Sequence, residues 1–144
     1  SCELLYCSGA GLTPRPLRRI ASGGELSRVM LASKVVLGNA DGVDTLVFDE
    51  VDAGVGGSTA RALASVLADL AATHQVIVVT HLAQVAVMAD KHYVVSKEPG
   101  DVPQTLLDEV TGEARTAEIA RMLSGDQSEA SLAHAKQMLE EARA

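Results

Sequence analysis

Residues 22–28 read Ser22-Gly23-Gly24-Glu25-Leu26-Ser27-Arg28, a turn with two glycines that leads into a helical pattern. A helix begins with backbone N–H groups that have no partner within the helix, and they carry the positive end of its dipole. Gly23 and Gly24 have no side chains, so a phosphate can approach that backbone closely beside the Ser22 hydroxyl. The run therefore predicts a phosphate-binding helix start. The alternative is an ordinary turn in which Ser22 caps the helix.

A second run, Leu46-Val47-Phe48-Asp49-Glu50, ends an apolar predicted strand in two carboxylates. Open α/β sheets bind their ligands at the carboxyl ends of their parallel strands. An aspartate there suits Mg²⁺, and a glutamate beside it can polarise an attacking water. We therefore predict Asp49 as a metal ligand and Glu50 as a catalytic residue. The alternative is a solvated pair of acids at the end of a strand.

Two further side chains lie close to these runs in the predicted topology. His81 follows the apolar stretch 76–79 and would lie beside Asp49 and Glu50 if the two strands are parallel neighbours. There it can contact a terminal phosphate, although a lone histidine is more often structural. Asp52 lies in the glycine-rich run 51–57 and is either a turn residue or a functional one.

The hydrophobic pattern predicts strands over 2–8, 44–49, 75–80, 93–96 and 104–110, and helices over 24–38, from 58 or 59 to 71, and 83–88. Two more helices are expected in the tail, the first ending at Gly125 and the second using Leu132, Ala135 and Leu139. Residues 46–48 and 76–79 lack polar alternation, which favours strands covered on both faces. The strand–helix–strand–helix order over 44–89 predicts parallel strands with crossover helices. The expected fold class is α/β, a mainly parallel sheet flanked by helices.

The composition limits the classes of function that this chain can have. The 144 residues suit about one domain, and they are 47% hydrophobic but only 2% aromatic, so small aliphatic side chains must build the core. The net charge of −7 and the scattered basic residues make this chain a poor main contact for DNA. No apolar stretch has the length of a membrane span, and two cysteines without a metal-ligand pattern suit a reduced, cytoplasmic protein. His74, His92 and His134 are expected at the surface.

One motif is absent from the whole sequence: no G-x-x-x-x-G-K-[S/T] phosphate loop occurs. The lysine and backbone amides of that loop hold the β- and γ-phosphates of a nucleotide. This chain therefore cannot hold a triphosphate by that route alone. We expect the missing part to lie upstream in a longer parent protein, or on another chain.

Taken in order, the motifs resemble the C-terminal lobe of an ABC-type ATPase head. Residues 22–28 resemble the signature motif, 47–50 Walker B with its catalytic glutamate, 51–54 the D-loop, and Thr80-His81 the switch histidine. More closely, the segments 22–34, 48–57, 79–90 and 118–125 are similar to the coiled-coil, SMC-like ATPases of bacterial DNA repair. Ala83 departs from that pattern, where a proline is expected.

The resemblance implies that residues 1–144 form one lobe of a head whose other lobe, with Walker A, is joined to it through a long coiled coil. Two heads would sandwich two ATP molecules with Mg²⁺. Residues 22–25 (Ser22, Gly23, Gly24 and Glu25) would bind nucleotide on the opposite head, and Asp52 would cross the dimer interface. Within its own head Asp49 would hold Mg²⁺, Glu50 would activate water and His81 would contact the γ-phosphate. ATP-driven closure would be coupled, on the bacterial nucleoid, to tethered DNA in double-strand break repair and recombination.

Three other functions share part of this pattern. Ser22, Asp49 and His81 occur in the order of an α/β-hydrolase triad, but the G-x-S-x-G turn of that fold is absent. A structural SMC-like gate with little ATP turnover is the main alternative, and the presence of Glu50 favours an active ATPase over it. A transporter ATPase is a more distant relative. The isolated chain is predicted to be inactive.

Overall fold

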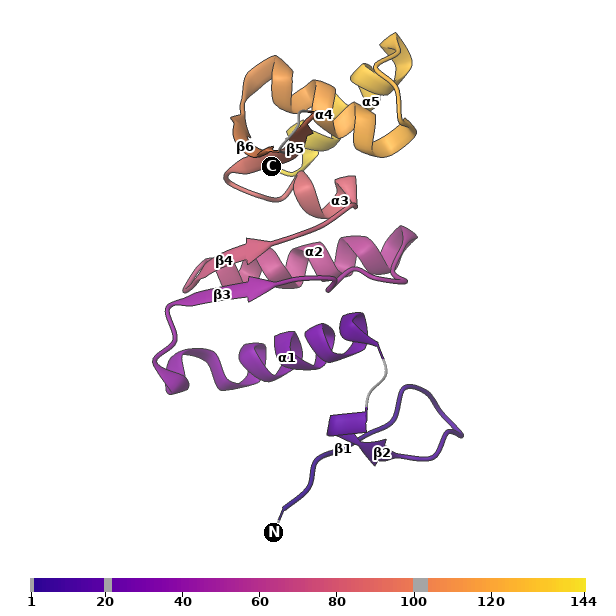
Figure 1. Cartoon of the computed structure of the whole chain (residues 1–144), viewed down its shortest axis with the longest axis vertical. Coiled ribbons are helices and arrows are strands. Elements are labelled where there is room, and N and C mark those ends of the chain that lie inside the picture. The colour runs from indigo at the N-terminus through magenta and orange to yellow at the C-terminus, as the bar shows by residue number, and fades with distance from the viewer. Residues whose placement is uncertain (1, 20–21, 100–103) are drawn as a thin grey trace. The chain divides into compact units, whose positions relative to one another are not determined.

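The computed structural model describes residues 2–19, 22–99 and 104–144, which form two compact units (Figure 1). The first unit comprises the described residues of 2–59 and 66–80, and the second comprises those of 60–65 and 81–144. The elements in chain order are β1 (Leu5–Tyr6), β2 (Arg15–Pro16), the 3₁₀ turn η1 (Leu17–Arg19), α1 (Gly23–Leu37), η2 (Gly38–Asp41), β3 (Thr45–Phe48), α2 (Gly57–Ala71), β4 (Gln75–Val78), α3 (Ala83–Ala86), β5 (His92–Glu98), β6 (Gln104–Val110), α4 (Gly112–Ser124) and α5 (Glu129–Glu141). None of the helices in these ranges is long and apolar enough to cross a membrane.

The strands form three pairs, and one of them is parallel. Strands β3 and β4 run parallel from Thr45 opposite Gln75 to Phe48 opposite Val78, with the crossover through α2 that the sequence predicted. Strands β1 and β2 are antiparallel, as are β5 and β6. The connection 99–103 is too short for a parallel crossover, which needs a dozen or more residues. The fold is therefore mixed α/β. The expected mainly parallel sheet is not found among the described strands, of which only β3 and β4 pair in parallel.

The parallel pair is not covered on both faces in the part of the chain that is described. Leu46 and Phe48 on β3 are buried, whereas Val47 between them is 65% exposed. On β4 the neighbouring Ile77 is 46% exposed. The prediction that both faces of the two strands are covered is therefore wrong for Val47 and Ile77. Side chains alternate between the two faces of a strand, and packing covers only one face of β3 and β4 here.

Helix α1 begins and ends close to its predicted limits and runs alongside β3 (Figure 1). Ser22 is its N-cap, and the Ser22 hydroxyl accepts a hydrogen bond from the Glu25 N–H at 3.4 Å. Helix α2 begins at Gly57 with no side-chain cap, so the predicted caps Ser58 and Thr59 lie inside the helix instead. Its predicted apolar face is confirmed in its buried residues Ala60, Leu63, Ala64, Leu67 and Leu70.

The second unit has its core between the two tail helices. Ile119, Ala120 and Ala135 have no exposed surface, and Leu139 packs with them against residues of α3. Helix α4 ends at Gly125, as predicted, where a left-handed backbone with φ 77° stops the helix. The guanidinium of Arg115 on α4 donates to three carbonyls at the end of α3, those of Ala86, Val87 and Ala89, at 2.6–3.3 Å.

Two of the three histidines expected at the surface are partly or fully enclosed. His74 is buried, and its Nδ1 lies 2.9 Å from the Thr73 hydroxyl. Burial lowers the pKa of His92, the positive charge of Arg115 lowers it further, and the charge of Glu118 partly opposes both. His134 is exposed, as predicted. A single histidine in an apolar pattern does not reveal which neighbours will cover it.

Candidate functional site

The start of α1 and the acidic end of β3 lie against each other in the first unit. A Cβ placed on Gly23 would lie 2.5 Å from Oε2 of Glu50. A Cβ on Gly24 would lie 2.8 Å from the Cβ of Ala53 and 2.9 Å from the backbone oxygen of Glu50. All three distances are shorter than real Cβ contacts. Gly24 is required by this approach because it meets a backbone oxygen and a Cβ, whereas at Gly23 the flexible end of the Glu50 side chain can move aside. The first turn of α1 therefore lies against both the side chain and the backbone of Glu50.

Two residues of α1 bind the backbone of the loop that follows β3. The Ser27 hydroxyl donates to the carbonyl of Asp49 at 2.7 Å. Nη1 of Arg28 donates to the carbonyls of Val51 and Ala53 at 3.1 and 2.9 Å. Both residues lie in the predicted signature run, but no role of their own was predicted for them.

The spacing of residues in the sequence could have indicated which side of α1 meets the loop after β3. Residues 23 and 27, like residues 24 and 28, are four apart in α1 and so lie on one side of the helix. That side holds the two glycines that approach the loop and the two polar side chains that bind it.

Glu50 adopts a backbone conformation that non-glycine residues seldom take. Its φ is 57°, and it is the one non-glycine residue with a positive φ in the described chain. The chain turns there, and the N–H of Ala53 donates to the Glu50 carbonyl at 3.0 Å. The side chains of Asp49 and Glu50 are both exposed. The turn therefore ends the strand and leaves both carboxylates accessible, as the sequence predicted for a strand end.

Asp52 is buried rather than displayed. It is 7% exposed, and its Oδ2 accepts a hydrogen bond from the hydroxyl of Thr80. Thr80 follows β4, and the N–H of Val79 beside it donates to the carbonyl of Phe48 at 2.9 Å. The Asp52 carboxylate thus joins the loop after β3 to the end of the neighbouring strand.

His81 is an exposed residue of the second unit. The parallel pairing of β3 and β4, which its predicted role requires, is present. Ala83, where the resemblance led us to expect proline, is the first residue of α3. The first position of a helix accepts proline and alanine alike, so alanine in place of proline leaves the local fold intact.

The described residues contain no group of three or more His, Cys, Asp or Glu side chains able to hold a metal ion. Mg²⁺ is usually bound through one or two carboxylates, water and substrate phosphates. Asp49 supplies one such exposed carboxylate. The donor set therefore fits a metal that arrives with a nucleotide.

No protein-family model matches the chain. Among curated proteins, DNA repair protein RecN of Treponema pallidum is 53% identical over 139 residues, which is 95% of this chain and 24% of that protein. RecN of Streptomyces coelicolor is 50% identical over 144 residues, 99% of this chain and 25% of that protein. The chain is homologous to a segment of RecN. It spans about a quarter of the length of these RecN relatives.

RecN of Deinococcus radiodurans is similar to the same extent, with 53% identity over 94% of this chain. One solved structure, from work on ATP-driven dimerization and DNA-stimulated activation of SMC ATPases, has a TM-score of 0.49 and 21% identity. It covers 94% of this chain and 69% of that chain. The resemblance to DNA repair proteins stated from the motifs is thus confirmed by the RecN homologues.

Proposed function

We propose that this chain is the C-terminal lobe of an ATP-hydrolysing, SMC-like head that acts in DNA double-strand break repair and recombination. The observation that carries the proposal is the contact between the glycines of the signature run and Glu50. It joins the helix start, which would bind the nucleotide of the opposite head, to the loop that carries Glu50 for the nucleotide of its own head. Homology to RecN supports the repair function.

In the proposed reaction Glu50 activates the attacking water, and Asp49 binds Mg²⁺ together with the ATP phosphates. Mg²⁺ would supply charge neutralisation on those phosphates. Ser22, Gly23, Gly24 and Glu25 bind the nucleotide carried by the opposite head of a homodimer, and His81 contacts the γ-phosphate. Asp52 acts at the dimer interface, where a donor on the opposite head would replace or supplement the Thr80 hydroxyl.

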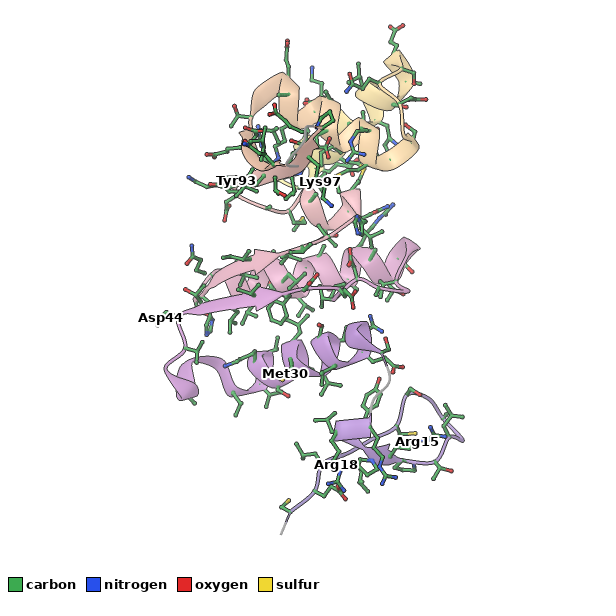
Figure 2. The ribbon with its side chains drawn as sticks, viewed as in Figure 1. Arg15, Arg18, Met30, Asp44, Tyr93 and Lys97 are labelled. Atoms are coloured by element: carbon green, nitrogen blue, oxygen red, sulfur yellow. The ribbon has the colours of Figure 1, made fainter. Side chains whose placement is uncertain are left out.

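The missing phosphate loop is supplied, in this proposal, by an N-terminal lobe of the same parent protein joined through a coiled coil. An apolar groove supports such a partner: it has a volume of about 220 Å³ and is lined by Leu26, Met30 and Val47 among other residues of α1 and β3. Figure 2 shows the side chain of Met30 on α1. DNA is bound by other parts of the parent protein, because this chain carries a net charge of −7. In this proposal the parent acts on the nucleoid in the cytoplasm.

The test is Mg-ATP hydrolysis by this chain alone and after addition of its cognate N-terminal lobe. We expect no turnover by the chain alone, turnover on mixing, and loss of turnover with Glu50→Gln. Glu140→Gln, an exposed glutamate on α5, is the matched control and should leave turnover unchanged. Robust turnover by the pure chain alone would contradict the proposed need for a second lobe.

The competing function is an SMC-like structural gate with little ATP turnover. The presence of the Glu50 carboxylate beside Gly23 favours the active ATPase, because a gate does not need a carboxylate there. A properly folded mixture of the two lobes that binds ATP and dimerises without hydrolysing it would instead support the gate.

A further inference from the structure

We propose that Arg28 is a positioning residue for Glu50, holding the loop after β3 against the first turns of α1. The inference deepens the proposed ATPase function and rests on it. One guanidinium nitrogen binds two loop carbonyls, those of Val51 and Ala53, which lie on either side of Asp52. The Ser27 hydroxyl binds a third, that of Asp49, directly before Glu50. Three carbonyls within five consecutive residues are thus held by adjacent residues of one helix.

The guanidinium fits closely into the same contact that the glycines make. A Cβ on Gly24 would lie 3.1 Å from the Arg28 Nη1, as well as within 2.9 Å of the Glu50 backbone oxygen. The Arg28 nitrogen therefore lies between the helix start and the loop. A charged donor also forms stronger hydrogen bonds to carbonyls than a neutral one.

The loop needs an external restraint because its own backbone does not favour its path. Glu50 has a φ of 57°, a left-handed conformation that is unfavourable for a residue with a Cβ. Such conformations persist only when the surrounding structure over-determines them. The bonds from Ser27 and Arg28 begin one residue before Glu50 and end three residues after it. Arg28 is thereby in a position to fix where the Glu50 carboxylate points without touching that carboxylate.

This arrangement predicts a specific kinetic effect. Loss of Arg28 should let the loop move, so that Glu50 spends less time where it can activate water. The turnover number should fall while the affinity for ATP stays nearly constant, because residues 22–25 and the phosphate loop still bind the nucleotide. A purely structural arginine would instead affect folding without separating kcat from KM.

The experiment uses the full-length parent protein with Arg28→Met, Arg28→Lys and the control Arg61→Met. Arg61 is an exposed arginine on α2. For Arg28→Met we expect kcat to fall about tenfold or more with KM for ATP changed less than about twofold, since small misplacements of a catalytic group have effects of this size. Arg28→Lys keeps a cationic donor and should recover part of the rate. Arg61→Met should match the unsubstituted protein.

Hydrogen exchange supplies a readout that does not depend on catalysis. In Arg28→Met, amides of residues 49–55 should exchange faster, while the core of α4 and α5 around Ile119 and Ala135 exchanges as before. Arg28→Met with unchanged kcat and unchanged loop exchange would overturn the proposal. So would a raised KM at constant kcat, or a uniform loss of protection across α4 and α5. If the unsubstituted parent hydrolyses no ATP, the ATPase function fails, and the exchange of residues 49–55 still decides whether Arg28 holds the loop.

Discussion

Glu50 combines a proposed catalytic role with a backbone conformation that costs stability. The left-handed region penalises a residue with a Cβ by about 1–2 kcal/mol, whereas glycine enters it freely. Here φ is 57° at Glu50, so the carboxylate is held at a position where glycine would be the better structural choice. Stability and activity are therefore expected to respond to this residue in opposite directions.

We predict that the free energy of unfolding of Glu50→Gly is about 1 kcal/mol higher than that of Glu50→Ala, although both variants lack the carboxylate. Chemical denaturation of the head with both lobes present measures the difference. Both variants should be inactive in ATP hydrolysis. Equal stability of the two variants would show that the loop relaxes away from the left-handed conformation when the glutamate is removed.

The two signature glycines should respond differently to alanine. In Gly23→Ala the new methyl group meets the end of the flexible Glu50 side chain, so we expect nearly normal stability but impaired hydrolysis. In Gly24→Ala it meets the Ala53 Cβ and the Glu50 backbone oxygen, which cannot move without shifting the loop. This overpacking should cost about 1–3 kcal/mol of unfolding free energy.

Gly56→Ala is the control for both substitutions. Its backbone is extended, with φ −160°, and a Cβ there meets no atom within 4 Å. Melting temperatures and steady-state ATPase rates, measured side by side, distinguish the three variants. Equal loss of stability in Gly23→Ala and Gly24→Ala would contradict the assignment of the Gly23 contact to a flexible side chain.

At the scale of elements, the connection between α4 and α5 is organised by one carboxylate. Asp126 accepts hydrogen bonds from the hydroxyls of Ser131, Ser128 and Ser124 and from the Ser128 N–H. These bonds, led by the one from Ser131, lower the pKa of Asp126 to about 2. Ser128 also caps α5, so the network joins the end of one helix to the start of the next.

We predict a measured pKa near 2 for Asp126 and a higher value in Ser131→Ala, which removes the leading donor. An unfolded chain protonates aspartate near pH 3.9. Because folding lowers the pKa, the stabilising effect is fully present above that pH and is lost as the pH falls through about 2. NMR titration of the side-chain carboxyl measures both variants. An unchanged pKa in Ser131→Ala would contradict the hydrogen-bond assignment.

The elements that periodicity defines were predictable, and the contacts between them were not. Helices α1, α4 and α5 and strand β6 follow the predicted patterns closely, since their apolar spacing reports directly which face is buried. The strand expected over 2–8 shrinks to β1, Leu5–Tyr6. Asp49 and Glu50 follow directly after β3, as predicted, and their roles stay predictions. The roles of Ser27 and Arg28 were missed, because their partners are backbone carbonyls 22 to 25 residues away, which no side-chain pattern encodes.

At the scale of the whole molecule, the apolar side chains left exposed on the first unit predict a partner surface. Val47 on β3 is 65% exposed and lines the groove beside α1. Isolated, this chain should self-associate through such surfaces, and addition of the N-terminal lobe should replace that association with a defined complex. Light scattering coupled to size-exclusion chromatography measures both states.

Val47→Thr is predicted to weaken binding of the N-terminal lobe, because it removes apolar contact while keeping the β-branched shape. Val95→Thr on β5 is the matched control: Val95 is 66% exposed and lies in the second unit. Calorimetric titration of one lobe with the other should show weaker binding for Val47→Thr only. Equal affinities for the two variants would place the lobe interface elsewhere.

The loop that carries Glu50 has a shape set largely by chirality. Left-handed residues occur at Glu50, Gly54 and Gly57, three positions within eight. The backbone conformation of such a loop depends on which positions can adopt a positive φ. It depends only weakly on the size of the side chains between those positions. Nucleotide-dependent rearrangement here would then proceed by displacement of the loop as a preformed body. Engineered diversity should be easiest to introduce at Val55, which lies between two left-handed positions.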